Sequence, residues 1–283
     1  MTVQRRVLSA MALAALTAFA GLAQSQERRD AFRPCIDPSN LPFANAKGEG
    51  FENRIADLFA QKLGLPVRNY TFPQRMNFIR NTLRYRAPGE DYACDVVMSV
   101  PADYDQAWPT SPYYRSTYAL VYPKGKGLDS VKRGTDLFAL PPERLQNLVI
   151  GVYDRSPAGL WLTKHGLEAR AKPYPMMSPD PDQYPGSIVD KELAQGRIDA
   201  AIVWGPIASY YAKRVHNMDL VVVPLRSEPG VKFDYAIAMG VRQGEGEWRT
   251  TVNKLITDNQ AAITAILREY SVPLVDERGE PLQ

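Results

Sequence analysis

Hydrophobic residues recur along the chain in two spacings, which predict alternating strands and helices. An apolar run at residues 31–36 predicts a short strand. The strand ends at Asp37-Pro38, because proline has no N–H for a sheet and favours extended geometry in the residue before it. Apolar positions then recur at helical spacing from Phe51 to Leu63, and Gly64 is typical of a helix end. Such a strand–loop–helix unit either borders a ligand crevice in an open α/β sheet or is an ordinary connection.

The same alternation continues to the C-terminus. Residues 173–186 contain five prolines and predict a surface loop without regular structure. Further strands are predicted at residues 67–72, 95–100, 118–122, 148–153, 198–204, 220–223 and 233–241. Helices are predicted from Pro73 through Leu83, at residues 160–165, after a Ser187 cap, at residues 207–213 and over one long C-terminal segment, 248–270.

Both halves of this pattern begin with a strand, a loop and a helix, and each later contains a buried strand that starts at an acid and ends at a proline. We therefore expect an α/β fold with two lobes, each a mostly parallel sheet flanked by helices, and a cleft between them. The expected domains are residues 24–120 as the first part of lobe 1, 121–230 as lobe 2, and 231–283 as a return to lobe 1 with the C-terminal helix.

The N-terminus has the pattern of a secretory signal peptide at residues 1–23. Arg5-Arg6 precede an apolar run from Val7 to Leu22, and small residues follow as cleavage sites. A membrane anchor is the alternative, but the run is short for a bilayer span. We expect a periplasmic protein that does not cross the membrane, and we expect a monomer.

Charge and motifs exclude several function classes. The chain has 34 Lys and Arg against 31 Asp and Glu, and removing Arg5 and Arg6 leaves a net charge of +1, so no nucleic-acid partner is expected. The two histidines, His165 and His216, lack metal-ligand spacing. The sequence contains no Walker A loop, dinucleotide fingerprint or nucleophile elbow. We therefore expect neither an enzyme nor a cofactor or metal.

Cys35 and Cys94 are the only cysteines. Export to an oxidising compartment favours a disulfide between them. However, Cys35 falls late in its predicted strand and Cys94 at the start of another, which would offset the two residues if the strands are parallel neighbours. The sequence leaves the pairing open.

Several short motifs resemble known families. Their order resembles the type II periplasmic substrate-binding proteins of the amino-acid-receptor branch, through Gly50-Phe-Glu-Asn53 and the acid before the third strand. A narrower resemblance is to the MxaJ/XoxJ family. It is carried by Asp37-Pro-Ser-Asn-Leu-Pro-Phe, Gly48-Glu-Gly-Phe-Glu-Asn, Phe72-Pro-Gln-Arg, Cys94-Asp-Val-Val-Met-Ser-Val-Pro, Pro112-Tyr-Tyr-Arg-Ser-Thr-Tyr and Val203-Trp-Gly-Pro.

The narrower resemblance implies a non-catalytic periplasmic accessory of a quinoprotein, PQQ-dependent methanol dehydrogenase. The implied partner is the catalytic subunit of that dehydrogenase, with its cytochrome c as a further partner. The implied action is to bind the enzyme or a segment of it and assist its maturation or activation. The alternative is an ABC-transporter receptor for an unidentified small solute.

The sequence departs from amino-acid receptors at the two ligand clamps. Tyr104 stands near the place of the arginine that holds the ligand carboxylate, and Trp204 stands where an aspartate holds the amino group. Aromatic side chains suit a partner surface, although each of them could instead belong to a lobe core. Arg75 and Arg115 could meet acidic groups or pair internally. The expected cleft residues are Asp37, Asn40, Phe43, Glu52, Arg75, Tyr104, Tyr113, Tyr114, Arg115, Tyr153, Trp161 and Trp204.

Overall fold

The computed structural model describes residues 29–74, 77–176 and 184–282, and Ala31–Gln283 forms one compact unit. The predicted signal peptide lies outside the described residues. In the described ranges, none of the helices combines the length and apolarity that a membrane span requires. The unit is an α/β fold, as predicted.

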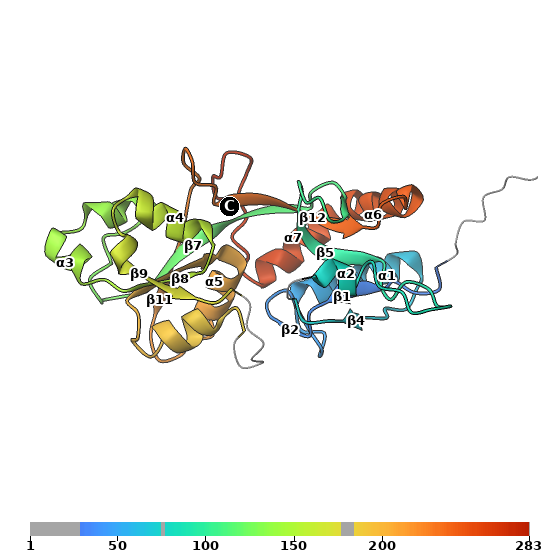
Figure 1. Cartoon of the computed structure of the whole chain (residues 1–283), viewed down its shortest axis with the longest axis horizontal. Coiled ribbons are helices and arrows are strands. Elements are labelled where there is room, and N and C mark those ends of the chain that lie inside the picture. Colours follow the sequence, from blue (N-terminus) through green and yellow to red (C-terminus); the bar gives the residue numbers. More distant parts are fainter. Residues whose placement is uncertain (1–28, 75–76, 177–183, 283) are drawn as a thin grey trace, which may run out of the picture. The chain divides into compact units, whose positions relative to one another are not determined.

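Short helices and strands alternate through the unit (Figure 1). The strands are β1 (Pro34–Ile36), β2 (Ser39–Asn40), β3 (Ala44–Asn45), β4 (Tyr70–Thr71), β5 (Val96–Pro101), β6 (Trp108–Pro109), β7 (Tyr114–Pro123), β8 (Ile150–Tyr153), β9 (Ala171–Tyr174), β10 (Ala200–Trp204), β11 (Leu220–Pro224) and β12 (Asp234–Val241). The α-helices are α1 (Phe51–Leu63), α2 (Phe78–Asn81), α3 (Pro142–Gln146), α4 (Pro157–Lys164), α5 (Gly205–Ala212), α6 (Gly246–Asp258) and α7 (Gln260–Glu269). The helical turns η1 (Gly134–Ala139) and η2 (Glu168–Arg170) are 3₁₀, and η3 (Ile188–Leu193) is a π-helix.

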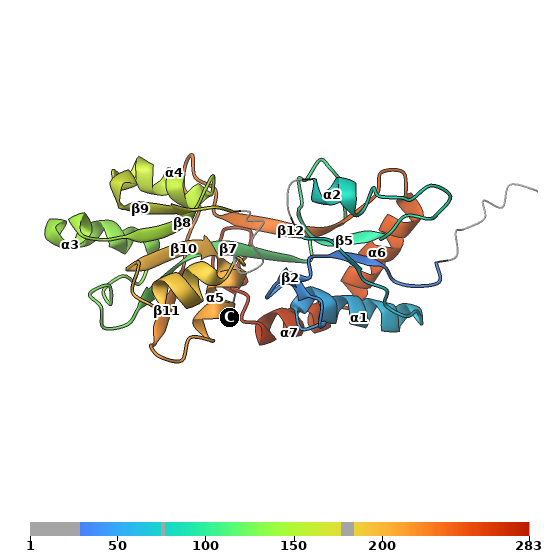
Figure 2. The ribbon, with the colours of Figure 1, turned by 60° about the horizontal axis from the view of Figure 1, so that its bottom comes forward.

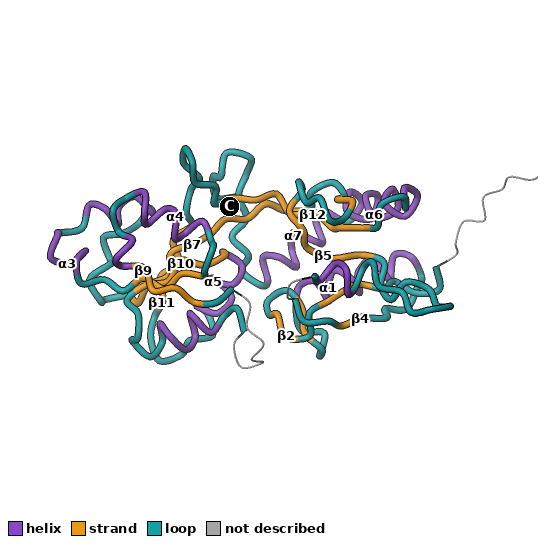
Figure 3. The backbone as a smooth tube through the Cα atoms, viewed as in Figure 1, coloured by secondary structure: helices purple, strands orange, loops and turns teal. Residues whose placement is uncertain are grey.

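Strands β7 and β12 link two groups of parallel strands. The sheet order is β4-β1-β5-β12-β7-β10-β8-β9, with β6 on β12 and β11 on β7. The start of β7 pairs with β12, and its remainder pairs with β10 and β11 (Figure 3). We call β4, β1 and β5 with their helices the first half, and β10, β8 and β9 with theirs the second half. The predicted lobe boundaries at residues 120 and 230 stay a prediction.

Side chains of each half pack on both faces of its strands, which is typical of parallel sheets. In the first half, Val96 and Met98 pack against α1, α6 and α7, whereas Val97 packs with Ile79 of α2 on the opposite face. Figure 2 shows α1 and α7 on one side of β5 and α2 on the other. The second half follows the same rule, because alternate residues of β10 face two separate clusters.

Several predicted elements differ from the structure in their bounds or type, and three of these differences have a clear physical reason. The C-terminal helix is two helices, because the chain leaves helical geometry at Asn259, whose side-chain amide donates to the Leu255 carbonyl over 2.8 Å. The proline-rich loop begins with a strand, β9, which pairs with β8 at the edge of the sheet, where proline is tolerated. Ser187 makes no side-chain cap, because its backbone is already helical.

Cys35 and Cys94 form a disulfide with 5.3 Å between their Cα atoms. Strands β1 and β5 are parallel neighbours, as expected, with Cys35 opposite Val97. The predicted offset is nevertheless wrong, because the chain bends at Ala93 and Asp95 and brings Cys94 back over Cys35.

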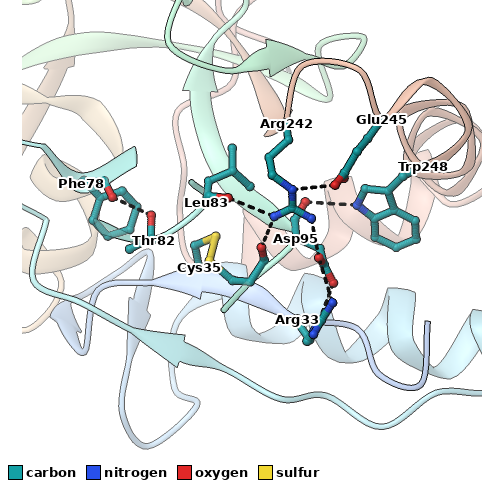
Figure 4. Close-up of a disulfide and its surroundings, with 10 residues drawn as sticks. Arg33, Cys35, Phe78, Thr82, Leu83, Asp95, Arg242, Glu245 and Trp248 are labelled. Carbon is teal, nitrogen blue, oxygen red and sulfur yellow. Dashed lines mark hydrogen bonds and ion pairs between the residues drawn. A yellow bond between two sulfur atoms is a disulfide. The ribbon is translucent and has the colours of Figure 1, made fainter. Parts of the chain in front are cut away.

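Beside the disulfide, the Asp95 carboxylate accepts hydrogen bonds from Arg33 and Arg242, each over 2.7 Å (Figure 4). Arg242 also donates to the carbonyls of Leu83 and Cys94, and it pairs with Glu245. This closed network joins β1, β5 and the segment after β12.

Candidate functional site

A cavity of about 450 Å³ lies between the carboxyl ends of β1 and β5 in the first half and those of β8 and β10 in the second. This position is the one in which open α/β sheets bind ligands. Its lining from the first half includes Cys35, Asp37, Pro38, Ser39, Asn40, Phe43, Glu52, Pro73, Gln74, Phe78, Val97, Ser99, Val100 and Pro101. The rest comes from Tyr114, Tyr118, Tyr153, Met176, Tyr184, Pro185, Trp204, Ile207 and Ile237.

The turn before α1 fixes two lining residues, Phe43 and Glu52. Gly50 begins the helix, and a side chain at Gly50 would collide with the Phe43 carbonyl, so only glycine fits. The Glu52 N–H donates to the same carbonyl over 2.8 Å, and the Phe51 N–H donates to Pro42 over 2.9 Å. The first turn of α1 is therefore tied to the loop after β1.

Asp37 and Asn40 form a polar rim on the first half. The Asp37 carboxylate accepts the N–H of Ser39 over 2.8 Å and that of Gln74 over 2.6 Å. Asn40 donates to the Gln74 side chain over 2.8 Å. These bonds hold the loops after β1 and β4 together at the mouth of the cavity.

Glu52 is a buried carboxyl group in the cavity wall, 7 % exposed. Its pKa is raised to about 7: burial is the main cause, a hydrogen bond with Ser99 opposes the rise, and the nearby Asp37 carboxylate adds to it. Among the described residues that line the cavity, none is Lys, Arg or His. Glu52 therefore meets no cation across the described lining.

Tyr113 and Tyr114 are adjacent but occupy different environments. The Tyr113 hydroxyl donates to the Met98 carbonyl over 2.8 Å and lies 3.1 Å from the Ser99 hydroxyl. Tyr114 lines the cavity, and its buried hydroxyl interacts with Ser99 but makes no hydrogen bond of standard geometry with a described residue. Burial raises the pKa of both phenols, so both are neutral at physiological pH.

Aromatic rings form the wall on the second half. Trp204, at the end of β10, packs edge-on against Tyr118 with 5.4 Å between ring centroids. Tyr153, at the end of β8, donates its hydroxyl proton to the Pro185 carbonyl. Tyr184 donates to Asp190 over 2.6 Å. These contacts hold the rings in place, and the rings present fixed apolar surfaces to the cavity.

The structure brings together seven of the twelve predicted cleft residues and places four elsewhere. Asp37, Asn40, Phe43, Glu52, Tyr114, Tyr153 and Trp204 line the cavity. Arg75 lies outside the described residues.

The four corrections have separate physical reasons. Trp161 is 2 % exposed and belongs to the core of the second half, where it packs against Phe138. Tyr113 is held behind the wall by its two hydrogen bonds. Arg115 pairs with Asp234. Tyr104 packs at the edge of the α2 cluster and not in the lining.

Ser99, Tyr118 and Tyr184 also line the cavity, although they are not among the residues predicted from the sequence. Ser99 is the one polar residue in the apolar run Val96–Val100, and this signal could have identified it. Tyr118 and Tyr184 carried no comparable signal, because aromatic residues in strands and loops most often pack in cores.

Comparisons with known proteins agree on one family, although no family model matches the chain. The chain is 34 % identical to the periplasmic binding protein XoxJ from Methylobacterium extorquens AM1, whose crystal structure aligns with a TM-score of 0.68 over 87 % of this chain and 100 % of XoxJ. It is 27 % identical to protein MoxJ of Paracoccus denitrificans, over 96 % of this chain and 97 % of MoxJ.

More distant structures share the fold alone. An ancestral arginine-binding protein bound to glutamine is 22 % identical, with a TM-score of 0.55 over 86 % of this chain and 99 % of that protein. The predicted type II periplasmic binding protein fold is confirmed. The chain belongs to the family of periplasmic binding proteins that includes XoxJ, MxaJ and MoxJ.

Proposed function

We propose that this protein is an exported, non-catalytic accessory of a PQQ-dependent methanol dehydrogenase. It binds the catalytic subunit, or a segment of it, in the aromatic cavity and assists its maturation or activation. The proposal rests on family membership and on one observation, the chemistry of the cavity lining.

That observation argues against a free amino acid as the ligand. A free amino acid carries a carboxylate, for which a buried arginine is the natural partner. The described lining offers no arginine, lysine or histidine, and Trp204 occupies the end of β10. Rigid aromatic surfaces instead suit the side chains of a polypeptide, because they bury a large area at small entropic cost.

The experiment uses the purified protein and the purified catalytic subunit of a PQQ-dependent methanol dehydrogenase, in mature and in PQQ-free form. We expect a complex by calorimetry, and Trp204→Ala weakens it by about 2 kcal/mol, roughly thirtyfold in Kd. Melting temperatures establish that the variant is folded.

A matched pair of exposed apolar residues gives the control. Met176 is 47 % exposed and lines the cavity, whereas Leu160 is 56 % exposed on α4 and does not. Met176→Ala weakens the complex and Leu160→Ala leaves it unchanged. If no complex forms and a small solute instead raises the melting temperature strongly, the protein is a solute receptor and the proposal is wrong.

A further inference from the structure

The inner wall of the cavity contains oxygen atoms with unused hydrogen-bonding capacity. Glu52, Ser99 and Tyr114 all line the cavity. Ser99 interacts with both Glu52 and Tyr114. Ser99 and Tyr114 also both contact Tyr113, over 3.1 Å between hydroxyl oxygens and 4.8 Å between ring centroids, so the three groups are neighbours. The Tyr114 side chain is 7 % exposed, and its hydroxyl makes no hydrogen bond of standard geometry with a described residue. A buried hydroxyl without a partner is costly, and a ligand that supplies one is favoured.

The charges around this wall favour a cation and disfavour an anion. Asp37 is a second carboxyl group of the lining and acts electrostatically on Glu52. The N–H groups of Phe51 and Glu52, which could otherwise attract an anion to the start of α1, already donate to Pro42 and Phe43. Bringing a cation to a buried carboxylate relieves both the burial and the like-charge repulsion.

The number of acceptor oxygens in this wall indicates which kind of cation fits. A primary ammonium group has three N–H donors, and three oxygen-bearing side chains are available here. The aromatic rings of the lining, among them Phe43 in the first half and Trp204 in the second, suit the four-carbon stem that carries such a group. A free amino acid would also bring a carboxylate, for which the described lining has no cation. A lysine inside a polypeptide brings the ammonium without that carboxylate.

We propose that this wall binds the ammonium group of a lysine side chain in the partner segment, with Glu52, Ser99 and Tyr114 as its acceptors. The inference rests on the proposed function, since it names the chemistry by which the cavity recognises that segment. Glu52 supplies the counter-charge, and the two hydroxyls accept the remaining N–H groups.

The first test measures binding of two blocked tripeptides to the full protein by calorimetry at about pH 8. Acetyl-Ala-Lys-Ala-amide and its norleucine counterpart share the same stem and differ in the ammonium group. We expect the lysine peptide to bind at least about tenfold more tightly. Equal affinities overturn the proposal.

The second test uses variants. Glu52→Gln keeps the size of the side chain and removes its charge, and we expect it to abolish the preference for lysine while the norleucine peptide binds as before. Glu247→Gln makes the same change on an exposed residue of α6 and leaves the preference intact. A lysine preference that survives in Glu52→Gln overturns the proposal.

A pH series on the unmodified protein tests the site without any substitution. The titratable groups that face Glu52 are Asp37, Tyr113 and Tyr114, and both tyrosines remain neutral in the range used. Because a proton on Glu52 competes with the ammonium group, affinity for the lysine peptide rises from about pH 6 to about pH 8. Affinity for the norleucine peptide stays flat, and parallel profiles for the two peptides contradict the proposal.

Two further arms identify the source of the ammonium and separate this inference from the proposed function. If n-butylamine binds as tightly as the lysine peptide, the ligand is a free amine and the assignment to a polypeptide is wrong.

If the dehydrogenase binds equally to the unmodified protein and to Glu52→Gln, the proposed function stands and this inference fails. If the lysine peptide binds through Glu52 and the dehydrogenase does not bind, the proposed function fails alone.

Discussion

Two buried carboxyl groups of the first half, Asp95 and Glu52, have opposite surroundings. Asp95 is fully buried and accepts hydrogen bonds from two guanidinium groups, those of Arg33 and Arg242 (Figure 4). Glu52 is almost as deeply buried, but it meets a serine and another carboxyl group. The difference separates an acid that two arginines neutralise from an acid that meets no cation in the described lining of the cavity.

A buried carboxylate persists in a protein when cations and hydrogen bonds compensate its lost hydration. Around Asp95 the compensation extends outward, since Arg242 also binds Glu245 and two backbone carbonyls and stacks over the Tyr92 ring. Among the described residues, Glu52 interacts with the Ser99 hydroxyl and meets no cation, and it lies at a cavity surface. We therefore read Asp95 as structural and Glu52 as a binding group, and four experiments test this comparison.

The largest effect is expected at Asp95. Asp95→Ala leaves Arg242 buried beside its remaining partners without its main counter-charge, and we expect the free energy of unfolding to fall by about 5 kcal/mol in urea denaturation. The control is Asp258→Ala, which removes an exposed pair with Lys254 and costs below about 1 kcal/mol. Similar losses for the two variants contradict the structural role of Asp95.

The disulfide beside Asp95 gives the second effect. It closes a loop with a sequence separation of 59, so replacing both Cys35 and Cys94 by serine lowers the free energy of unfolding by about 4 kcal/mol. Denaturation of the unmodified protein in reducing buffer gives a matching loss, and the reductant leaves the double variant unchanged. If reductant does not change the stability of the unmodified protein, the interpretation is wrong.

The sequence predicted the fold well where local pattern determines structure. The helix Phe51–Leu63 was predicted to the residue, because its apolar spacing and Gly64 define both the buried face and the end. The pairing of Cys35 with Cys94 could not be predicted, because it depends on the bends at Ala93 and Asp95, outside the strands. No proline or glycine marks the break between α6 and α7 at Asn259, so the sequence pattern predicts a single helix there.

The candidate site was predicted less well than the fold. Loop motifs at Asp37–Phe43 and the ends of β8 and β10 located the cavity correctly, because parallel strands bring their carboxyl ends to one edge. Neighbouring tyrosines could not be told apart, since the sequence does not say that Tyr113 is bonded to Met98 and that Tyr114 faces the cavity. Trp161 was predicted wrongly because nothing in the sequence distinguishes an aromatic residue of the core from one that lines a site.

The third effect is a pH-dependent gain in stability on replacing Glu52 by glutamine. Below pH 4.5 the carboxyl is protonated in the folded and the unfolded chain. Between pH 4.5 and about 7 only the unfolded chain releases its proton, so stability falls as pH rises, by up to roughly 3 kcal/mol. Glu52→Gln removes this loss: the variant matches the unmodified protein at about pH 4 and exceeds it at about pH 8.

Urea denaturation at both pH values measures this effect, and Glu247→Gln, an exposed change, serves as the control with equal stability at both. If Glu52→Gln is destabilised at about pH 8, the carboxylate is compensated as Asp95 is, and the contrast between the two acids is lost.

The smallest effect separates the two tyrosines next to Glu52. Tyr113→Phe removes a hydroxyl that bonds to the Met98 carbonyl and to Ser99, so it lowers the free energy of unfolding by about 1–2 kcal/mol. Tyr114→Phe removes a buried hydroxyl that makes no hydrogen bond of standard geometry with a described residue, so stability stays the same or rises by up to about 1 kcal/mol. Each variant removes one hydroxyl oxygen, and the two residues are adjacent, so each variant is the control of the other. A loss at Tyr114 equal to that at Tyr113 would show that the fold already uses this hydroxyl and does not hold it available for a ligand beside Glu52.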